Sequence, residues 1–358
     1  MNQRIIGFDL ARAYAILGMF IVNFNMVFGS YKDQSVIGQF ISLFSGNSST
    51  VFVILAGMGI ALMTNRSEYS IIEKNKLRST ILKRAVFLFI IGLLLSIIWS
   101  SDILHFYGCY MIIVSFLLFS EKKYFLFFAF LSVLIFHILI FVIPYETGWN
   151  FDKFLYKDFY TINGFIRNTL YNGWNSVFPW IGYFLLGMYL GRLNWTDFKI
   201  QLKMFLIGLT LYLTITIIQF ISHHITISED FYLFINADYL PPFLPFILST
   251  SGFGLMIISG FMYLGSKVGE SQLAKDFAKT GQMTLTHYVS HVTLGMILFS
   301  ILKNKSLSEN VTMLQPSKPI FILLFSITYF VFSYWFSKLW IRHFKNGPLE
   351  TIMRKVSR

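Results

Sequence analysis

The sequence predicts an all-α protein that crosses a membrane many times, and three observations support this fold class. Hydrophobic residues make up 55% of the 358-residue chain and charged residues only 13%, whereas about a quarter of the residues are charged in an ordinary soluble domain. Long apolar segments recur along the chain, and Lys and Arg gather in the short segments between them. We therefore expect a single integral-membrane domain, residues 1–358, built as one bundle of about ten transmembrane helices.

The apolar segments define the expected helices in order, because a helix needs about 20 residues to cross a bilayer. The second, third and sixth segments are short, so eight spanning helices remain possible if a short segment only re-enters the membrane. The ten segments are 5–29, 46–63, 85–101, 103–119, 124–143, 175–191, 204–221, 242–265, 281–302 and 319–341.

The positive charges predict the orientation. With the N-terminus inside, 20 Lys and Arg fall in inner segments and 7 in outer segments, which is the positive-inside pattern. We therefore expect both termini in the cytoplasm, and the net charge of +12 indicates membrane orientation rather than nucleic-acid binding. The inner residues are Arg4, Arg66, Lys74, Lys76, Arg78, Lys83, Arg84, Lys122, Lys123, Arg192, Lys199, Lys203, Lys267, Lys275, Lys279, Arg342, Lys345, Arg354, Lys355 and Arg358. The outer residues are Lys32, Lys153, Lys157, Arg167, Lys303, Lys305 and Lys318.

The sequence predicts no intrachain disulfide, no structural zinc site and no cleaved signal peptide. Cys109 is the one cysteine, so no disulfide can form within the chain, and no Cys/His cluster indicates zinc. The first apolar segment is not followed by a small-residue cleavage site, so we expect it to stay as a signal anchor.

The first expected helix carries charges at membrane depth. Asp9 and Arg12 are three residues apart and can pair. Asn23 lies about three turns after Arg12 on the same face. Charges within a span usually face protein or an aqueous cavity. The stripe is either an ion pair at the inner interface, with Arg12 reaching towards lipid phosphates, or the wall of a cavity in which Arg12 holds an anionic group.

A second polar group follows the third segment. Asp102 and His105 are three residues apart near the expected outer face. A carboxylate beside a histidine fixes the imidazole tautomer and raises its basicity, as a general base requires. Asp102 is equally suited to cap the next helix. The two roles are compatible.

The ninth segment contains two histidines on one helix face, His287 and His291. His291 lies roughly 15 Å into the span, near the middle of the bilayer. Three interpretations remain open: hydrogen-bonded structural histidines, a catalytic or proton-relay role, or metal binding. Two ligands without an acidic third favour metal least, and we expect no metal.

Glycines mark places where helices can approach closely. Gly57 and Gly59 form one such surface, and Gly187 with Gly191 forms another. Phosphate-binding loops, dinucleotide fingerprints and the nucleophile elbow of α/β-hydrolases are absent from the sequence.

Six stretches together resemble the YeiB-like membrane proteins. These belong to a transmembrane acyltransferase superfamily that includes heparan-α-glucosaminide N-acetyltransferase. The similarity covers nearly the whole chain, and the stretches occur in the expected order. They are FDLARAYAILGMFIVNF, FVILAGMGIALM, DILHFYG, VFPWIGYFLLGMYLGR, GQMTLTHYVSH and FKNGPLETIMR.

The resemblance implies a bundle of ten or eleven helices in which acyl-CoA enters from the cytoplasm and an acceptor on the far side receives the acyl group. It also implies histidine chemistry. Asp9 and Arg12 match the first-helix motif, and His105 lies in the DILHFYG match. His287 and His291 stand where YeiB-like proteins more often have amides. The outer connection 30–45 contains no histidine, so a base proposed there in relatives has no counterpart.

Together these observations predict an integral-membrane acyltransferase that moves an acyl group, and we expect an acetyl group, from acyl-CoA to a cell-envelope sugar or lipid. We expect a multi-pass protein of a bacterial plasma membrane, which could be a homo-oligomer. The alternatives are a transporter or flippase of a lipid-linked or anionic metabolite, and a non-catalytic membrane partner protein.

The hypothesis assigns roles to particular side chains. His105 or His291 is the base, directly or through an acyl-histidine, with Asp102 and His287 beside them. The residues expected to contact CoA or line its path are Arg12, Asp9, Asn23, Arg66, Arg84 and Arg192.

Overall fold

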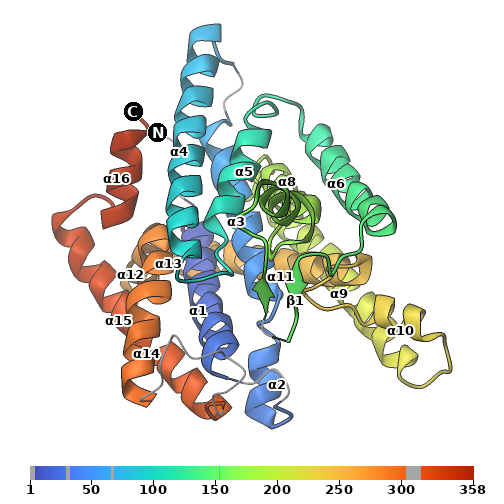
Figure 1. The fold of residues 1–358 in the computed structure, drawn as a ribbon. Helices are drawn as coiled ribbons and strands as arrows, with labels where there is room; N and C mark the ends of the chain where they lie inside the picture. Colours follow the sequence, from blue (N-terminus) through green and yellow to red (C-terminus); the bar gives the residue numbers. More distant parts are fainter. Residues whose placement is uncertain (1–4, 30–32, 66–67, 153, 304–315) are drawn as a thin grey trace. The chain divides into compact units, whose positions relative to one another are not determined.

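The computed structural model describes residues 5–29, 33–65, 68–152, 154–303 and 316–358 (Figure 1). In these residues the chain is helical throughout, apart from connecting turns and one two-stranded antiparallel hairpin. Eight helices of this part are long and apolar enough to cross a membrane. The expected all-α polytopic fold is confirmed, while the cytoplasmic placement of both termini stays a prediction. Arg66 lies outside the described residues, as do Arg4, Lys32, Lys153 and Lys305.

The ten expected segments correspond to these eight helices and two shorter apolar ones. The shorter helices are Leu104–Val114 and Val177–Leu190, the fourth and sixth of the expected series. The third begins at Ile71, fourteen residues before its expected start, because Ser70 and Glu73 form a capping box that nucleates a helix through the basic stretch. The sequence pattern therefore located the helices well but underestimated the third.

The chain forms two compact units, and each is described by itself. Unit 1 comprises residues 1–52, 195–209 and 253–352, and unit 2 comprises residues 53–194, 210–252 and 353–358. The expected single membrane domain stays a prediction.

Unit 1 contains the two segments that carry Asn23 and His291. Its complete helices are α1 (Ile6–Phe28), α2 (Val36–Ser42), α12 (Gln272–Gln282), α13 (Thr284–Ser290), the π-helix η2 (His291–Gly295), α14 (Met296–Lys303) and α15 (Pro319–His343). Four helices have residues in both units: α3 (Asn47–Met63), α9 (Phe198–Ser222), α11 (Leu244–Val268) and α16 (Pro348–Val356).

Unit 2 contains the segment that carries His105. Its complete elements are α4 (Ile71–Ser96), α5 (Leu104–Val114), α6 (Lys122–Val142), β1 (Trp149–Asn150), β2 (Leu155–Tyr156), α7 (Ile162–Arg167), the π-helix η1 (Asn168–Asn172), α8 (Val177–Leu190) and α10 (Glu229–Ile235).

Unit 1 is assembled around α1. Gly281 of α12 packs on the backbone of α1 at Asp9, where a Cβ would overlap the carbonyl oxygen. The carboxylate of Glu350, at the start of α16, accepts hydrogen bonds from the backbone N–H of Leu285 at 2.8 Å and of Thr286 at 3.1 Å. Glu350 therefore caps the first turn of α13 from 65 residues away.

Unit 2 confirms the close approach predicted for three of the glycines. A Cβ at Gly57 of α3 would overlap the carbonyl oxygen of Phe184, and one at Gly187 of α8 would overlap that of Ile54. Gly191 lies against Met58 and Ala61 in the same way. Reciprocal contacts of this kind bring the backbones of α3 and α8 together. The surface at Gly59 stays a prediction.

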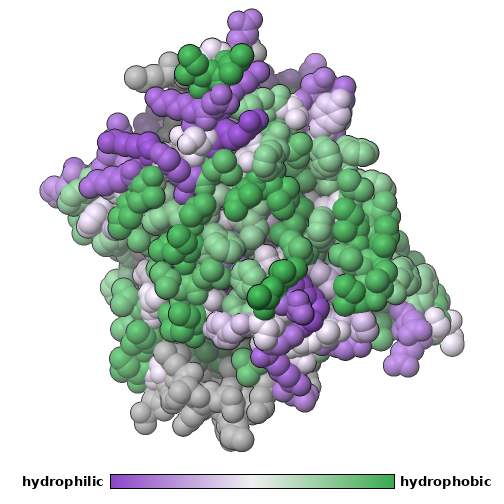
Figure 2. Space-filling view, turned by 45° about the horizontal axis from the view of Figure 1, so that its top comes forward, coloured by the Kyte–Doolittle hydropathy of each residue, from purple (hydrophilic) through white to green (hydrophobic). Residues whose placement is uncertain are grey.

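Exposed apolar side chains cover broad areas of the face shown in Figure 2, and hydrophilic side chains gather apart from them. Along α4 the exposed fractions are 49% for Val86, 51% for Ile90 and 59% for Leu94. A soluble monomer rarely exposes so much contiguous apolar surface, so we assign these side chains to contact with lipid.

Candidate functional site

Asp102 and His105 form a buried pair at the start of α5. One carboxylate oxygen of Asp102, Oδ2, accepts from the backbone N–H of Leu104 at 2.8 Å and of His105 at 3.1 Å. The same oxygen lies 3.2 Å from His105 Nδ1. Asp102 therefore caps the helix and also holds the imidazole, so the two roles left open by the sequence coexist.

The pairing determines which nitrogen of His105 carries the proton. A carboxylate only accepts, so Nδ1 bears the hydrogen and Nε2 presents its lone pair. His105 is 1% exposed, and Nε2 has no hydrogen-bond partner among the described residues. A buried imidazole with a carboxylate on one nitrogen and an open lone pair on the other has the arrangement of a general base.

Gly92 of α4 makes this arrangement possible. A Cβ at Gly92 would lie 2.6 Å from Asp102 Oδ2 and would overlap the backbone nitrogen of His105. The centroid of the His105 ring lies 3.8 Å from that of Phe106 and 6.1 Å from that of Phe159. Gly92 is a residue of this candidate site that the sequence analysis missed, because only the packing of α4 on α5 reveals it.

Asn23 and His291 meet in unit 1, as the polar stripe on the first helix allowed. Asn23 Nδ2 donates to His291 Nε2 at 2.8 Å, and both side chains are buried. His291 Nδ1 lies 3.3 Å from the carbonyl oxygen of His287, to which it donates. Both nitrogens of His291 are thus engaged by neutral groups.

The helix around His291 is irregular and aromatic. His291 begins the π-helix η2, and such segments often occur at functional sites. The rings of Phe20 and Tyr288 lie 5.1 Å and 5.2 Å from that of His291. Nearby in unit 1, the hydroxyls of Ser290 and Tyr329 are 2.6 Å apart.

His287 is held by α15. Its Nε2 lies 2.7 Å from Ser337 Oγ, and this hydroxyl donates its own hydrogen to the carbonyl oxygen of Ser333 at 2.8 Å. The Ser337 oxygen therefore accepts from His287, which makes Nε2–H the donor. This contact connects two helices of unit 1. Among the described residues, no group of three or more His, Cys, Asp or Glu could hold a metal ion.

The predicted ion pair of the first helix is present. Arg12 Nη1 lies 3.8 Å from Asp9 Oδ1, and the guanidinium lies over the Phe8 ring at 4.1 Å from its centroid. Asp9 is almost fully buried, whereas 28% of the Arg12 side chain is exposed. Arg12 is therefore the more exposed member of this pair.

The two other described arginines assigned to CoA bind protein groups. Arg192 donates to the carbonyl oxygen of Leu118 at 2.8 Å and to the hydroxyl of Thr64 at 2.9 Å. Burial lowers the pKa of Arg192. Arg84 Nε donates to Ser357 Oγ at 3.2 Å. These contacts give both arginines a structural part in unit 2.

A polar pocket of about 600 Å³ lies where Arg192 holds the loops of unit 2 together. Lys74 and Lys122 line it with exposed side chains, and Glu68 is its acidic residue. The volume is in the usual range for a small-molecule site. Its described lining residues are Thr64, Glu68, Tyr69, Lys74, Phe119, Ser120, Lys122 and Arg192.

The comparison with known families decides what this chain is related to. Residues 4–224 match the family described as heparan-alpha-glucosaminide N-acetyltransferase, catalytic. The chain belongs to this family. Residues 191–358 match a second family, described as a protein of unknown function (DUF418), and together the two matches confirm the YeiB-like transmembrane acyltransferase superfamily. No curated protein matches the chain significantly.

The N-acetyltransferase family match separates the two histidine sites. Asp102, His105 and the polar pocket of unit 2 lie within residues 4–224. His287 and His291 lie outside this match, in the part of the chain that matches the second family. The chain is therefore a member of a membrane acetyltransferase family, and its His105 site falls in the part matched to the catalytic domain.

Proposed function

We propose that the protein is a membrane-bound acyltransferase in which His105 is the general base. The Asp102–His105 pair carries this proposal, because it combines a carboxylate on Nδ1, a lone pair on Nε2 and burial in one side chain. Asn23 with His291, and His287 with Ser337, then have structural roles. The family match to a catalytic domain over residues 4–224 supports this choice.

The proposed donor is acetyl-CoA or another acyl-CoA, bound by its phosphates in the polar pocket. Lys74 and Lys122 are exposed cations there and can hold phosphate oxygens. The part of α5 that follows His105, residues 106–114, is about 14 Å long at 1.5 Å per residue and leads towards Phe119 at the end of the pocket. Acyl-CoA fits such a separation because a long thin arm separates its thioester from its phosphates.

In the proposed reaction, His105 Nε2 takes the proton from an acceptor hydroxyl or amine while that group attacks the thioester carbonyl. Asp102 keeps Nδ1–H in place and stabilises the imidazolium that forms. The C–S bond breaks, and the imidazolium returns the proton to the departing thiolate. The proposed acceptor is a sugar or lipid of the cell envelope. The proposed location of the enzyme is the plasma membrane.

The experiment uses purified full-length protein in liposomes with labelled acetyl-CoA and envelope sugars and lipids. We expect transfer of the acetyl group, and a loss of about 10²- to 10⁴-fold in His105→Ala because a general base contributes that much. Acetyl-CoA binding should persist in this variant. Transfer at the wild-type rate would contradict the assignment of His105, and pH-dependent uptake without any transfer would favour a transporter.

The donor site has its own test. Lys74→Gln with Lys122→Gln should weaken acetyl-CoA binding about tenfold or more, since each loses a charge-assisted hydrogen bond. Lys123→Gln is the matched control, because Lys123 is next in sequence but pairs with Glu121 at 2.9 Å and does not line the pocket. Equal affinity in the double variant and the control would place the donor elsewhere.

A further inference from the structure

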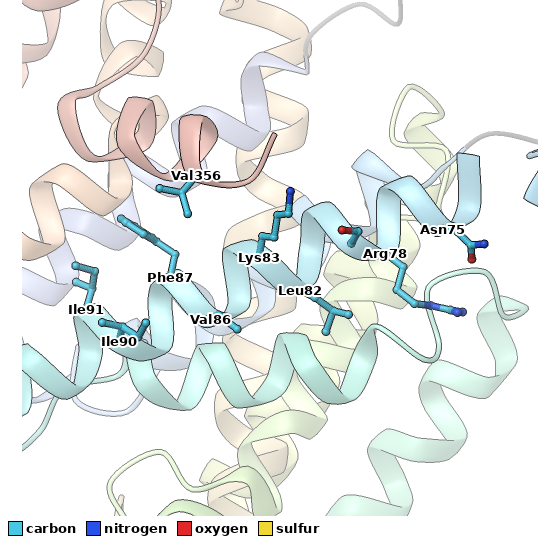
Figure 3. Close-up of a pocket in the computed structure, with 10 residues that line it drawn as sticks. Asn75, Arg78, Leu82, Lys83, Val86, Phe87, Ile90, Ile91 and Val356 are labelled. Carbon is cyan, nitrogen blue, oxygen red and sulfur yellow. The ribbon is translucent and has the colours of Figure 1, made fainter. Parts of the chain in front are cut away.

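A second pocket of about 600 Å³ in unit 2 lies along the exposed side of α4 (Figure 3). Nine of its ten described lining residues come from α4, and the tenth is Val356 of α16. The pocket is separate from the polar pocket and from His105, since it shares no lining residue with either. The ten residues are Asn75, Arg78, Ser79, Leu82, Lys83, Val86, Phe87, Ile90, Ile91 and Val356.

The lining changes from polar to apolar along the helix. Figure 3 shows Asn75 and Arg78 towards one end, Lys83 near the middle and Ile91 towards the other end, with Val356 opposite Phe87. From Arg78 to Ile91 the helix rises about 20 Å, somewhat more than the roughly 15 Å hydrocarbon thickness of one leaflet. The groove therefore has the length and polarity of a single lipid molecule lying along the helix.

The polar end is positively charged. None of the ten described lining residues is acidic. Lys83 Nζ is anchored by the carbonyl oxygen of Arg358 at 2.5 Å, and Arg78 Nε by that of Ser115 at 3.1 Å. Each contact fixes the side chain through one donor and leaves it further N–H groups. The two cations are five positions apart on α4 and bind different partners, so each marks one edge of the positively charged polar end. An anionic headgroup is attracted to such an end.

The neighbouring helix α16 has the character of an interfacial helix. Ile352 and Val356 lie on one face and are 48% and 54% exposed. Arg354 and Lys355 are basic residues of the last turn. Helices of this kind lie at the level of the lipid headgroups. The helix α16, which contributes Val356 to the groove, is therefore suited to lie at the depth of the lipid phosphates.

We propose that this groove binds an anionic phospholipid. Its phosphate lies next to Lys83, within the positive potential to which Arg78 adds, and one acyl chain follows Val86, Ile90 and Ile91 towards the lipid-facing surface of α4. The charge of the polar end selects an anionic headgroup over a zwitterionic one. The site is independent of acyl transfer and would serve to hold α4 and the end of α16 at the membrane surface.

Native mass spectrometry of the full-length protein in detergent tests this proposal, with phosphatidylglycerol and phosphatidylcholine of identical chains as probes. We expect phosphatidylglycerol to bind more tightly. Removing a cation near an anionic lipid weakens binding about fivefold, so Arg78→Gln with Lys83→Gln should lose about 25-fold. Lys76→Gln is the charge control, because Lys76 is an exposed lysine of the same helix outside the groove.

The apolar half of the groove, which would bind the acyl chain of the lipid, is tested by filling it with a larger side chain. Ile90→Trp should displace the lipid, whereas Leu94→Trp should not, since both residues are exposed on α4 and only Ile90 lines the groove. Equal binding of the two phospholipids, or an unchanged affinity in the double charge variant, would overturn the proposal. Glycerol phosphate competing as well as the intact lipid would also overturn it, because the apolar half would then contribute nothing.

Discussion

His105 in unit 2 and His291 in unit 1 are the same residue type at nearly the same burial, and they differ in what holds them. His105 has a carboxylate, Asp102, on Nδ1 and an open Nε2. His291 has the amide of Asn23 on Nε2 and a backbone carbonyl on Nδ1. Asp102 leaves Nε2 of His105 with its lone pair, whereas the amide N–H of Asn23 occupies the lone pair of His291 Nε2. Partner chemistry, more than burial, separates a base from a structural histidine.

The largest expected effect comes from making the His105 site resemble the His291 site. Asp102→Asn keeps an oxygen that can accept from the Leu104 and His105 N–H groups, so the helix cap survives. It removes the charge that stabilises the imidazolium, and the rate of acyl transfer should fall by about 10²-fold or more. The measurement is kcat with acetyl-CoA across pH.

The reverse exchange is the control for that comparison. Asn23→Asp gives His291 a carboxylate, yet it should not raise transfer or rescue Asp102→Asn, since the proposed reaction uses Nε2 of His105. A rescue would show that His291 can replace His105 as the base, and it would contradict the distinction drawn between the two histidines.

A second way to sharpen the comparison is to remove the partner of His291. Asn23→Ala leaves a buried imidazole nitrogen without its donor, which costs about 1–3 kcal/mol of unfolding free energy. The transfer rate per folded molecule should stay at the wild-type value. Thermal unfolding and the transfer assay on the same preparation separate the two effects, and a stable but inactive variant would assign His291 to the chemistry.

The third test uses two glycines with opposite surroundings. Gly92→Ala drives a methyl group into Asp102 and His105 and should destabilise the protein by about 1–3 kcal/mol, with loss of transfer. Gly260→Ala is the matched control, because no described atom lies within 4 Å of a Cβ there. In a helix interior this change is expected to stabilise by about 0.5–1 kcal/mol. Similar melting temperatures for the two variants would contradict the close packing of α4 on α5.

The smallest expected effect concerns a charged cluster in unit 1 that takes no part in the chemistry. Burial alone raises the pKa of Asp276, but hydrogen bonds from Lys279 and Lys338 lower it to about 2. A lowered pKa stabilises the fold above about pH 4, and this contribution is lost as the pH falls from about 4 to 2. Both lysines are about a quarter exposed, so the contribution is about 1 kcal/mol.

The measurement for this cluster is thermal unfolding of the wild type and of Asp276→Asn between pH 6 and about pH 2. The difference between their melting temperatures should shrink as the pH falls through that range. A constant difference would mean that Asp276 does not titrate there.

Hydropathy predicted most of this fold because long apolar helices leave a strong pattern. All ten expected segments are helical in the structure. The helices α2, α7, α10, α12 and α16 were not anticipated, because they are short or amphipathic. The early start of α4 at Ile71 depends on a capping box that hydropathy does not register.

The sequence revealed the candidate site only in part, for a reason of distance along the chain. Asp102 and His105 are three residues apart, so helix geometry alone predicted their contact. Asn23 and His291 are 268 residues apart, and a shared polar character cannot specify that they bond to each other. The same limit hid Gly92, whose importance comes from the backbone of another helix.

The bond between Glu350 and the first turn of α13 gives the end of the chain an influence on a distant helix. The carboxylate engages Leu285 and Thr286 just before His287. Proteolytic clipping after His343 would leave every residue of the histidine helix intact and still remove the acceptor for these amides. Fraying of α13 would follow, so hydrogen exchange at Leu285 would report the loss of Glu350, 65 positions away.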